Sequence, residues 1–286
     1  MVDKIKAFVF RVSLLIPDRI FLMLKYKKNL GIWPNLKNPK TFNEKLNWLK
    51  LYDRNPLYTV MVDKYEAKKY VADLIGEEYI IPTFGVWGKG EDIDFDALPD
   101  KFVLKTTHDS GSIIICKDKS RLNKEISIRE MNKSLKRNFY ASTREWPYKN
   151  VHRRIIAEQL LENADNQDIC DYKFFCFNGR VEFMKVDFDR FVDHHANYYD
   201  RQFRLLDFGE RDLPPIKEKN IDRPVEFGKM IQFAETLSKE CRFARVDFYE
   251  VQGRVYFGEI TFYPASGVGV FCPECADYEI GKLLKI

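Results

Sequence analysis

Two acidic side chains and one basic side chain near the end of the chain have a spacing that suits metal-assisted phosphate chemistry. Arg245 and Asp247 lie two residues apart in an apolar segment, and Glu259 follows twelve residues later. Two carboxylates on adjacent strands can bind Mg²⁺, with phosphate oxygens and water completing its octahedral shell. A neighbouring guanidinium stabilises the charge that develops on a transferring phosphoryl group. The segment therefore predicts a site for Mg²⁺ and a substrate phosphate, and a structural Arg–Asp ion pair is the alternative.

The register of this strand pair decides whether its two carboxylates can meet. A three-residue loop over 251–253, whose last residue is a glycine, places Arg245 opposite Glu259 and Asp247 opposite Phe257. The carboxylates are then diagonal neighbours on one face, about 7–8 Å apart at the backbone. Such loops often end in a left-handed residue, which glycine adopts without steric cost. A two-residue loop would turn Glu259 to the opposite face, so we predict the three-residue register.

A second group of residues suits the binding of phosphates. Lys105 ends an apolar segment and is followed by a short polar loop that contains His108, Ser110, Gly111 and Ser112. Backbone N–H groups of such a loop can surround phosphate oxygens, and a lysine can reach them as a point charge. An ordinary hairpin turn is the alternative interpretation.

A third group suits the nucleoside. The end of an apolar segment can offer backbone groups to the edge of an adenine and leucine side chains to its face; these residues are Glu158, Gln159, Leu160 and Leu161. Asp171 could accept hydrogen bonds from ribose hydroxyls. The alternative is a plain sheet strand with a surface glutamate.

Helices and strands must bring these groups together. Residues 41–75 have a helical pattern, with Thr41 and Glu44 spaced as a capping pair, and after Gly76 the pattern changes to strands and turns. The expected elements, in order, are strands at 102–105 and 112–115, a helix at 121–138, a strand at 154–161, paired strands at 172–177 and 180–186, a further pair at 196–199 and 203–206, a helix at 224–239, and a final pair at 243–250 and 254–262.

Local signals support these elements. Asn178-Gly179 is a strong signal for a hairpin turn, and Pro224 is predicted in the first turn of a helix. The high aromatic content of 15% favours sheet over a helix bundle. Strand pairs interrupted by two helices predict an α+β fold with largely antiparallel sheets.

Charge is distributed unevenly along the chain. Residues 1–50 carry eleven Lys or Arg against three acidic residues, a net charge of +8, so the remaining residues sum to −4 against the total of +4. A mildly acidic body argues against a nucleic-acid-binding protein. The apolar stretch 7–24 is interrupted by charged residues and proline, which excludes a membrane-spanning helix there. A basic amphipathic segment can instead lie on an anionic bilayer, and packing against the body explains its apolar residues equally well.

Six cysteines are scattered along the chain, and Cys272 and Cys275 form one C-x-x-C pair without a second pair at zinc-finger spacing. Most of them stand in apolar segments, where buried thiols are common. We therefore predict a reduced cytosolic protein, with residues 1–30 as a candidate contact to the inner face of the membrane.

The order of these groups resembles the ATP-grasp superfamily. The matching residues run from about 60 to 270: Asp63-Lys64, Lys105 with the loop from His108 to Ser112, the segment from Glu158 to Leu161, and Arg245, Asp247, Glu259 and Thr261. The resemblance implies two lobes that enclose a cleft for ATP and Mg²⁺. It implies phosphate binding by Lys64, Lys105 and Lys173, a catalytic Arg245, and metal binding by Asp247, Glu259 and Thr261. Thr261 departs from the usual asparagine, and Gln159 departs from a lysine found in some members.

More narrowly, the chain is similar to the TupA-like ATP-grasp family. The motifs that carry this resemblance are residues 42–48 (FNEKLNW), Asp63-Lys64, residues 171–179 (DYKFFCFNG), residues 189–191 (DRF) and residues 197–200 (NYYD). The resemblance implies catalytic roles for Lys173 and Arg190, and a part in cell-surface polysaccharide assembly that joins an amine or amino acid to a uronic-acid carboxylate. From the changes of element along the chain we expect a basic helical segment at 1–60, a first ATP-grasp lobe at 61–160 and a second lobe at 161–286.

Three other functions remain open at this point. A sugar kinase would use the same ATP site but transfer the phosphoryl group to a hydroxyl. A glycosyltransferase would use Asp187-Phe-Asp189, a short D-x-D pattern, as its metal motif. A non-catalytic scaffold would result if the altered hairpin no longer held Mg²⁺. Ligation of a small-molecule or oligosaccharide carboxylate to an amine is the favoured function.

Overall fold

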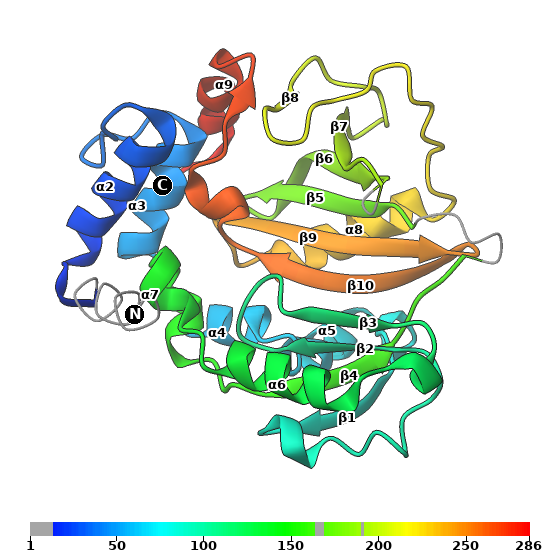
Figure 1. Cartoon of the computed structure of the whole chain (residues 1–286). Coiled ribbons are helices and arrows are strands. Elements are labelled where there is room, and N and C mark those ends of the chain that lie inside the picture. The colour runs from blue at the N-terminus through cyan, green and yellow to red at the C-terminus, as the bar shows by residue number, and fades with distance from the viewer. Residues whose placement is uncertain (1–13, 164–168, 190–191) are drawn as a thin grey trace.

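The structure is a computed structural model that describes residues 14–163, 169–189 and 192–286. Two antiparallel sheets lie one above the other, with a group of helices at one side (Figure 1). Every pairing between the strands of these sheets is antiparallel, which confirms the predicted α+β class. No helix in the described ranges has the length and apolar character needed to cross a membrane.

Four helices precede the first strand within the described residues. They are α2 (Asp18–Leu30), α3 (Phe42–Tyr52), α4 (Leu57–Val62) and α5 (Glu66–Ile75). The predicted capping box is present at α3, since the Thr41 hydroxyl accepts the N–H of Glu44 and the Glu44 carboxylate accepts the N–H of Thr41, both at 3.2 Å. Such reciprocal bonds satisfy N–H groups that a helix start leaves free.

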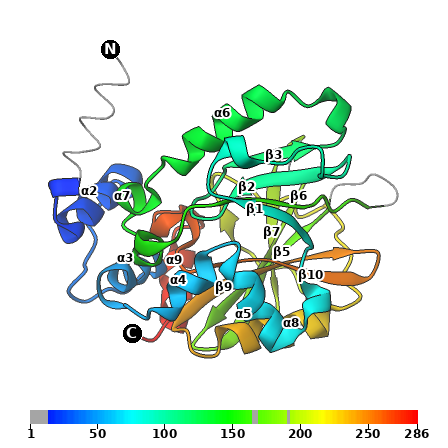
Figure 2. The same cartoon turned by 90° about the horizontal axis from the view of Figure 1, so that it is seen from below.

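The smaller sheet has the order β1-β4-β2-β3. Its strands are β1 (Thr83–Trp87), β2 (Phe102–Thr106), β3 (Ile113–Cys116) and β4 (Ile155–Gln159), and the helices α6 (Lys124–Leu135) and α7 (Phe139–Thr143) connect β3 to β4. Figure 2 shows α6 running beside this sheet. The predicted strands at 102–105, 112–115 and 154–161 and the predicted helix at 121–138 are confirmed.

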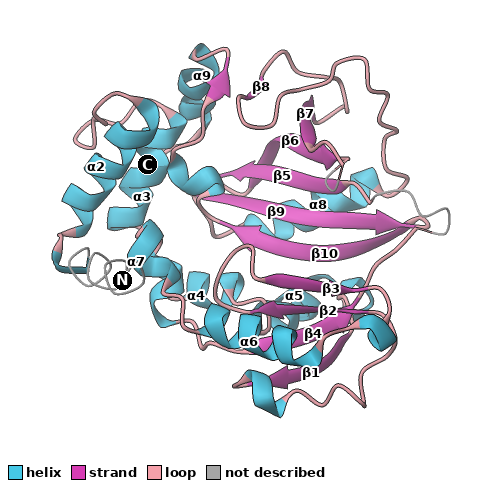
Figure 3. Ribbon diagram, in the orientation of Figure 1, coloured by secondary structure: helices cyan, strands magenta, loops and turns pink. Residues whose placement is uncertain are grey.

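The larger sheet has the order β10-β9-β5-β6-β7. Its strands are β5 (Asp171–Phe177), β6 (Arg180–Phe188), β7 (His195–Asp200), β9 (Phe243–Val251) and β10 (Arg254–Thr261). The helix α8 (Phe227–Ser238) covers one face of it, as Figure 3 shows. A short sheet of β8 (Gly209–Glu210) and β11 (Phe271–Cys272) and the helix α9 (Cys275–Leu283) complete the chain.

Five short 3₁₀ helices link these elements: η1 (Glu77–Tyr79), η2 (Gly90–Asp92), η3 (Lys119–Arg121), η4 (Trp146–Asn150) and η5 (Pro264–Gly267). The last of them directly follows the final hairpin.

Two predicted elements were wrong in detail. Residues 203–206 form no strand; β7 pairs with β6 instead, and only an isolated bridge joins Tyr199 to Leu205. The helix α8 begins at Phe227, so Pro224 lies before it rather than in its first turn. In both places the local signal was real, but tertiary pairing and packing set the boundaries.

The chain buries two hydrophobic cores. The smaller core lies under the four-stranded sheet and draws its residues from the range 93–157. The larger core, rich in phenylalanine, joins the five-stranded sheet to α8, α9 and the helices α3, α4 and α5. The division at residues 60 and 160 suggested by the sequence remains a proposal.

Candidate active site

The final hairpin places Asp247 and Glu259 on one face, as predicted, but its strand register differs from the predicted one. Its loop has two residues, Gln252 (φ 53°) and Gly253 (φ 73°), in the left-handed geometry that two-residue hairpins prefer. The three-residue register was therefore wrong. A β-bulge at Gly258 then places Glu259 directly opposite Asp247. An extra residue reverses the facing of everything beyond it, so both carboxylates emerge on one face after all.

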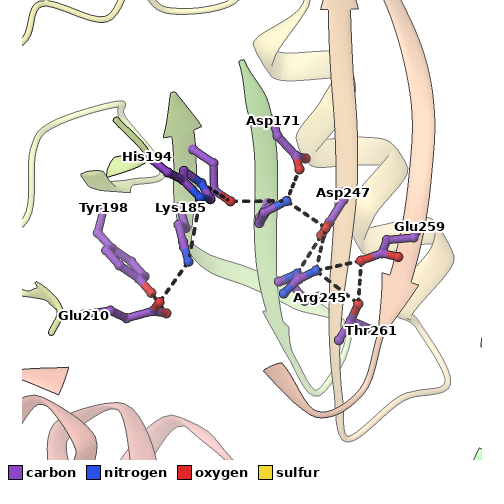
Figure 4. Close-up of polar contacts among 11 residues, drawn as sticks. Asp171, Lys185, His194, Tyr198, Glu210, Arg245, Asp247, Glu259 and Thr261 are labelled. Carbon is purple, nitrogen blue, oxygen red and sulfur yellow. Dashed lines mark hydrogen bonds and ion pairs between the residues drawn. The ribbon is translucent and has the colours of Figure 1, made fainter. Parts of the chain in front are cut away.

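The strand register extends this pair into a polar row across the whole sheet. Glu259 of β10 lies opposite Asp247 of β9, which lies opposite Lys173 of β5. Lys173 lies opposite Lys185 of β6, which in turn lies opposite Tyr198 of β7. Residues directly opposed across strands share a face of the sheet, so five strands contribute to one polar surface (Figure 4).

Arg245 organises the β9–β10 end of the row. Its guanidinium donates to both carboxylate oxygens of Asp247 at 2.7 and 2.6 Å and to Glu259 at 3.0 Å. The hydroxyl of Thr261 accepts from Arg245 at 3.1 Å and donates to Glu259 at 3.2 Å. Arg245 therefore contacts each of the three side chains proposed for metal binding.

Lys173 occupies the middle of the row. Its buried ammonium contacts Asp171 and lies 3.2 Å from a carboxylate oxygen of Asp247 and 3.7 Å from one of Asp187. Burial, together with the neighbouring Asp247 and Asp187 carboxylates, raises the pKa of Asp171 to about 6, although Lys173 opposes this shift. Asp171, proposed for the ribose, thus lies within the charged row on β5.

The adenine-side residues come from β4 and the segment after it. Glu158 is buried and its carboxylate binds two lysines, Lys105 and Lys68, the latter at 2.8 Å. Burial acts to raise its pKa, and the two ammonium groups prevail and lower it. Glu158 is therefore no surface glutamate, and Lys105 does not simply face solvent. Gln159 is exposed, whereas Leu160 and Leu161 are half-buried.

An aspartate that sequence reasoning missed holds the phosphate loop in shape. The buried carboxylate of Asp109 accepts the hydroxyl hydrogens of Thr106, at 2.5 Å, and of Ser112. Lys64 donates to the backbone carbonyl of Asp109, and Arg137 donates to Ser112 at 2.8 Å. The sequence did contain a signal for this role, because Thr106 and Ser112 stand three positions before and after Asp109.

The remaining loop residues differ in exposure. His108 is buried, and its Nε2 lies 3.1 Å from the carbonyl oxygen of Arg137. Ser110 and Gly111 are exposed, and Gly111 has a φ of 82°, which glycine adopts without strain. The loop thus keeps its tip free while its base is fixed by Asp109.

Electrostatics show that the two sheets share one site. The Glu259 side chain is only partly buried, and its partial desolvation acts to raise its pKa, yet four cations lower it to about 2; they are Lys64, Arg245, Lys173 and Lys105. Two of these come from the phosphate-loop side and two from the larger sheet. Four of the predicted residues therefore act on the charge of one carboxylate. Arg190 lies outside the described residues.

The β6–β7 end of the row was not predicted. Lys185 lies 2.9 Å from Oε2 of Glu210. The other carboxylate oxygen of Glu210 accepts the hydroxyl hydrogen of Tyr198 at 2.5 Å. Asp187 lies 3.5 Å from Lys185 and 3.4 Å from the Nε2 of His194. Lys185 and Asp187 lie two residues apart in one strand, as Arg245 and Asp247 do. This repeated spacing could have indicated the β6–β7 end from the sequence.

The donor set fits Mg²⁺ bound together with a nucleotide. Among residues 14–163, 169–189 and 192–286, no three His, Cys, Asp or Glu side chains converge tightly enough to hold a metal ion by themselves. Asp247 and Glu259 already face a common cationic atom of Arg245, at 2.6 and 3.0 Å. Because Mg²⁺ commonly takes one or two carboxylates and fills its shell with phosphate oxygens and water, this pair suits it.

Comparison with known proteins identifies the family. A family profile described as TupA-like ATPgrasp matches residues 44–285. The chain belongs to the TupA-like ATP-grasp family. This confirms the predicted family and the ATP-grasp fold, with ATP and Mg²⁺ as the cofactors. No curated protein sequence matches the chain.

Several solved structures are similar to this TupA-like ATP-grasp protein. A D-alanine–D-alanine ligase from Bacillus anthracis, complexed with ATP, is 17% identical, with 71% of this chain and 54% of the ligase covered and a TM-score of 0.41. The corresponding Helicobacter pylori ligase is 15% identical, with 85% and 69% covered and a TM-score of 0.41. An L-amino acid ligase from Bacillus licheniformis is 12% identical, with 79% and 50% covered and a TM-score of 0.44. The chain spans about half the length of the two Bacillus ligases.

Lys105 provides a direct test of the phosphate side. We expect Lys105→Met to weaken the affinity for Mg·ATP by about tenfold, or ~1.4 kcal/mol, the size of one charged hydrogen bond. The fold should persist because Glu158 keeps its contact with Lys68 at 2.8 Å. Titration calorimetry with Mg·ATP measures the effect, and Lys101→Met, which removes an exposed lysine paired with Glu162, is the control. Unchanged affinity in the Lys105 variant would remove this lysine from the site.

Proposed function

We propose that the protein is an ATP-dependent carboxylate–amine ligase. The observation that carries the proposal is the convergence of Lys64 and Lys105, from the phosphate-loop side, with Arg245 and Lys173 on the carboxylate of Glu259. A cluster that combines four cations with paired carboxylates suits a nucleotide whose phosphates bring Mg²⁺ with them.

The residues can be assigned roles in this reaction. Bound Mg²⁺ would neutralise charge on the phosphates, held by Asp247 and Glu259, with Thr261 as a neutral neighbour. Lys64 and Lys105 would bind phosphate oxygens from the loop side. Arg245 would stabilise the charge that develops as the substrate carboxylate attacks the γ-phosphate and becomes an acyl phosphate.

The amine is proposed to bind at the β6–β7 end of the row. Asp187 and Glu210 share Lys185, and Asp187 also lies 3.7 Å from Lys173, which Asp171 and Asp247 share, so carboxylates outnumber ammonium groups here. An excess negative charge in a partly buried site favours a protonated amine. His194 touches Asp187 and can take the proton that the amine must lose before it attacks the acyl phosphate. Phosphate then leaves as the C–N bond forms.

The substrates proposed from the family are a uronic-acid carboxylate and an amine or amino acid, within cell-surface polysaccharide assembly. The D-x-D alternative would use Asp187, which contacts Lys173 and Lys185, and Asp189, which contacts Lys219 at 2.9 Å. A sugar kinase would use the same ATP site, so the experiment must separate it from ligation.

Hydroxylamine trapping provides that separation. Hydroxylamine attacks an acyl phosphate without needing the natural amine and yields a hydroxamate that iron(III) detects. We expect Mg·ATP-dependent hydroxamate and ADP from a panel of uronic and amino acids. ADP formation with a sugar and without hydroxamate would indicate a kinase, and an absence of ADP with every compound would contradict the proposed function.

We further propose that the protein is cytoplasmic and contacts the inner face of the membrane through its N-terminal region. Within the described residues, α2 and the segments just before and after it expose a set of large apolar side chains: Leu14, Leu15, Ile20, Leu24, Ile32 and Trp33. Lys27 and Lys28 are exposed beside them. Apolar and basic groups together suit an anionic bilayer surface.

This contact predicts salt-sensitive binding to vesicles. Basic residues near an anionic surface contribute about 1 kcal/mol each, and this attraction weakens as salt rises. We expect sedimentation with anionic vesicles to fall in high salt and in the combined variant Leu24→Ser and Trp33→Ser. Phe84→Ser, at an exposed phenylalanine on β1, should leave sedimentation unchanged. Absence of salt-sensitive binding in the wild-type protein would overturn the membrane contact.

A further inference from the structure

A basic groove lies between α3 and the end of the chain, apart from the ATP-binding residues. It has a volume of about 500 Å³ and is formed by two segments far apart in sequence, within 37–48 and 282–286. All of its charged side chains are lysines: Lys37, Lys40, Lys45, Lys282 and Lys285. Trp48 also lines it.

Tight packing of α9 against α3 builds this groove. A side chain at Gly281 would meet the Lys40 carbonyl oxygen at 2.2 Å, so only glycine allows this approach. The Asp277 carboxylate accepts the N–H of Asn43 at 2.9 Å, and the Lys45 ammonium donates to the Leu284 carbonyl at 2.6 Å. The walls of the groove are thus held by specific contacts, and they carry Lys45, which is half-buried, and four exposed lysines.

Its lysines are poorly neutralised. Lys282 pairs with Glu279 at 2.7 Å, but Lys37, Lys40, Lys45 and Lys285 form no ion pair with any described residue. Burial, followed by the charge of Lys40, lowers the pKa of Lys45. Like charges held close together cost stability unless an anion joins them.

A second basic pocket of the same protein provides a comparison. It lies on α6, has a volume of about 400 Å³ and is lined by Arg129, Lys133 and Lys136. Two carboxylates, Glu91 and Glu125, also line it, and Glu130 lies 3.4 Å from Lys133. Here the protein supplies its own counter-charges, which the groove lacks.

We propose that the groove binds an acidic oligosaccharide, a short chain of carboxylate-bearing sugar rings. Lysine ammonium groups are compact point charges on flexible stems and suit carboxylates spaced along a chain. The half-buried Trp48, whose ring centroid lies 4.8 Å from that of Tyr52, offers an apolar surface for a sugar ring. The volume suits one or two rings. A concave groove with an aromatic wall fits such a chain better than it fits a flat bilayer.

The groove and the candidate active site lie on different sides of α3. Asn47 and Lys50 on this helix donate to the carbonyls of Gly267 and Ser266, at 2.6 and 3.0 Å, in the 3₁₀ helix that follows the final hairpin. Lys45 and Trp48 line the groove instead. The inference therefore goes beyond ligation and does not depend on it.

Binding of tetragalacturonate tests the proposal, with maltotetraose as the uncharged match and tripolyphosphate as an anion without rings. We expect calorimetry to detect tetragalacturonate and not maltotetraose. The combined variant Lys37→Glu, Lys40→Glu and Lys285→Glu should weaken binding by at least about tenfold, because each exposed ion pair contributes modestly. Trp48→Leu should weaken tetragalacturonate binding and leave any tripolyphosphate binding unchanged.

Charge reversal on α6 is the matched control. Arg129→Glu, Lys133→Glu and Lys136→Glu change the net charge equally and should leave tetragalacturonate binding intact. Three results would overturn the proposal: no binding of tetragalacturonate, equal losses in the two charge-reversed variants, or binding that Trp48→Leu does not affect. If the charge-reversed groove variant loses only its binding to anionic vesicles, the groove is a lipid-binding site instead. The readout requires no ATP, so failure here is distinct from a failure of hydroxamate formation.

Discussion

Replacing Glu259 by glutamine should reduce Mg·ATP-dependent turnover by about 1,000-fold, or ~4 kcal/mol of transition-state stabilisation. The substitution keeps the shape of the side chain but removes the charge on which Lys64, Arg245, Lys173 and Lys105 converge. Without that carboxylate, Mg²⁺ loses one of its two proposed protein ligands. Hydroxamate formation by the wild-type protein and the variant measures the effect.

The fold of this variant should be intact. The Glu259 side chain is 41% exposed and lies on the open face of the sheet, so its neutral analogue leaves no isolated charge in the core. A matched control is Glu182→Gln on β6, where the glutamate forms an ion pair with Arg180 at 3.7 Å. Equal activity of the Glu259 variant and the wild-type protein would exclude Glu259 as a metal ligand.

Lys173→Met should produce the largest loss of stability. Its ammonium is the common partner of Asp171, Asp187 and Asp247, all of which are buried. Removing one member of a buried ion cluster leaves uncompensated charge and typically costs about 3–5 kcal/mol. Denaturant unfolding measures this loss without any substrate. Lys219→Met, at an exposed lysine paired with Asp189, should change the free energy of unfolding little.

The loss should depend on pH in a defined direction. The pKa of Asp171 is already raised to about 6 in the folded protein, above its ordinary value. Such a carboxyl group binds a proton on folding, so the folded state gains stability as pH falls. Without Lys173 the pKa rises further, and the deficit should be largest near about pH 8 and shrink toward about pH 5.

A second substitution tests the same cause. Adding Asp171→Asn to Lys173→Met removes one of the stranded charges and should restore about 1 kcal/mol or more, because residues in one network do not act additively. If the two substitutions were additive, or if the deficit did not change with pH, the row would not be a coupled charge cluster.

Much of this protein could be predicted from local sequence. The capping box at Thr41 and Glu44 starts α3, and Asn178-Gly179 forms the turn between β5 and β6, because a few neighbouring residues suffice to determine such geometries. The pairing of Arg245 with Asp247 follows from their alternation on one strand. The order of these groups along the chain was enough to indicate the family.

Other features depended on tertiary structure. The two-residue loop at Gln252-Gly253 alone would have turned Glu259 away from Asp247, and the bulge at Gly258 restores the common face. Whether a strand accepts an extra residue depends on burial and pairing with its neighbours, which local sequence does not reveal. The common face of Asp247 and Glu259 was predicted, but the bulge that produces it was not.

The sequence by itself determined which residues could carry chemistry, whereas the tertiary structure decided their partners. Lys105 binds Glu158 across two paired strands, and Lys173 holds carboxylates from three strands. The β6–β7 end of the row went unnoticed because its polar groups meet only when β6 pairs with β7 and Glu210 of β8 reaches Lys185. Charge pairing depends on distances in space, and those are set by the fold as a whole.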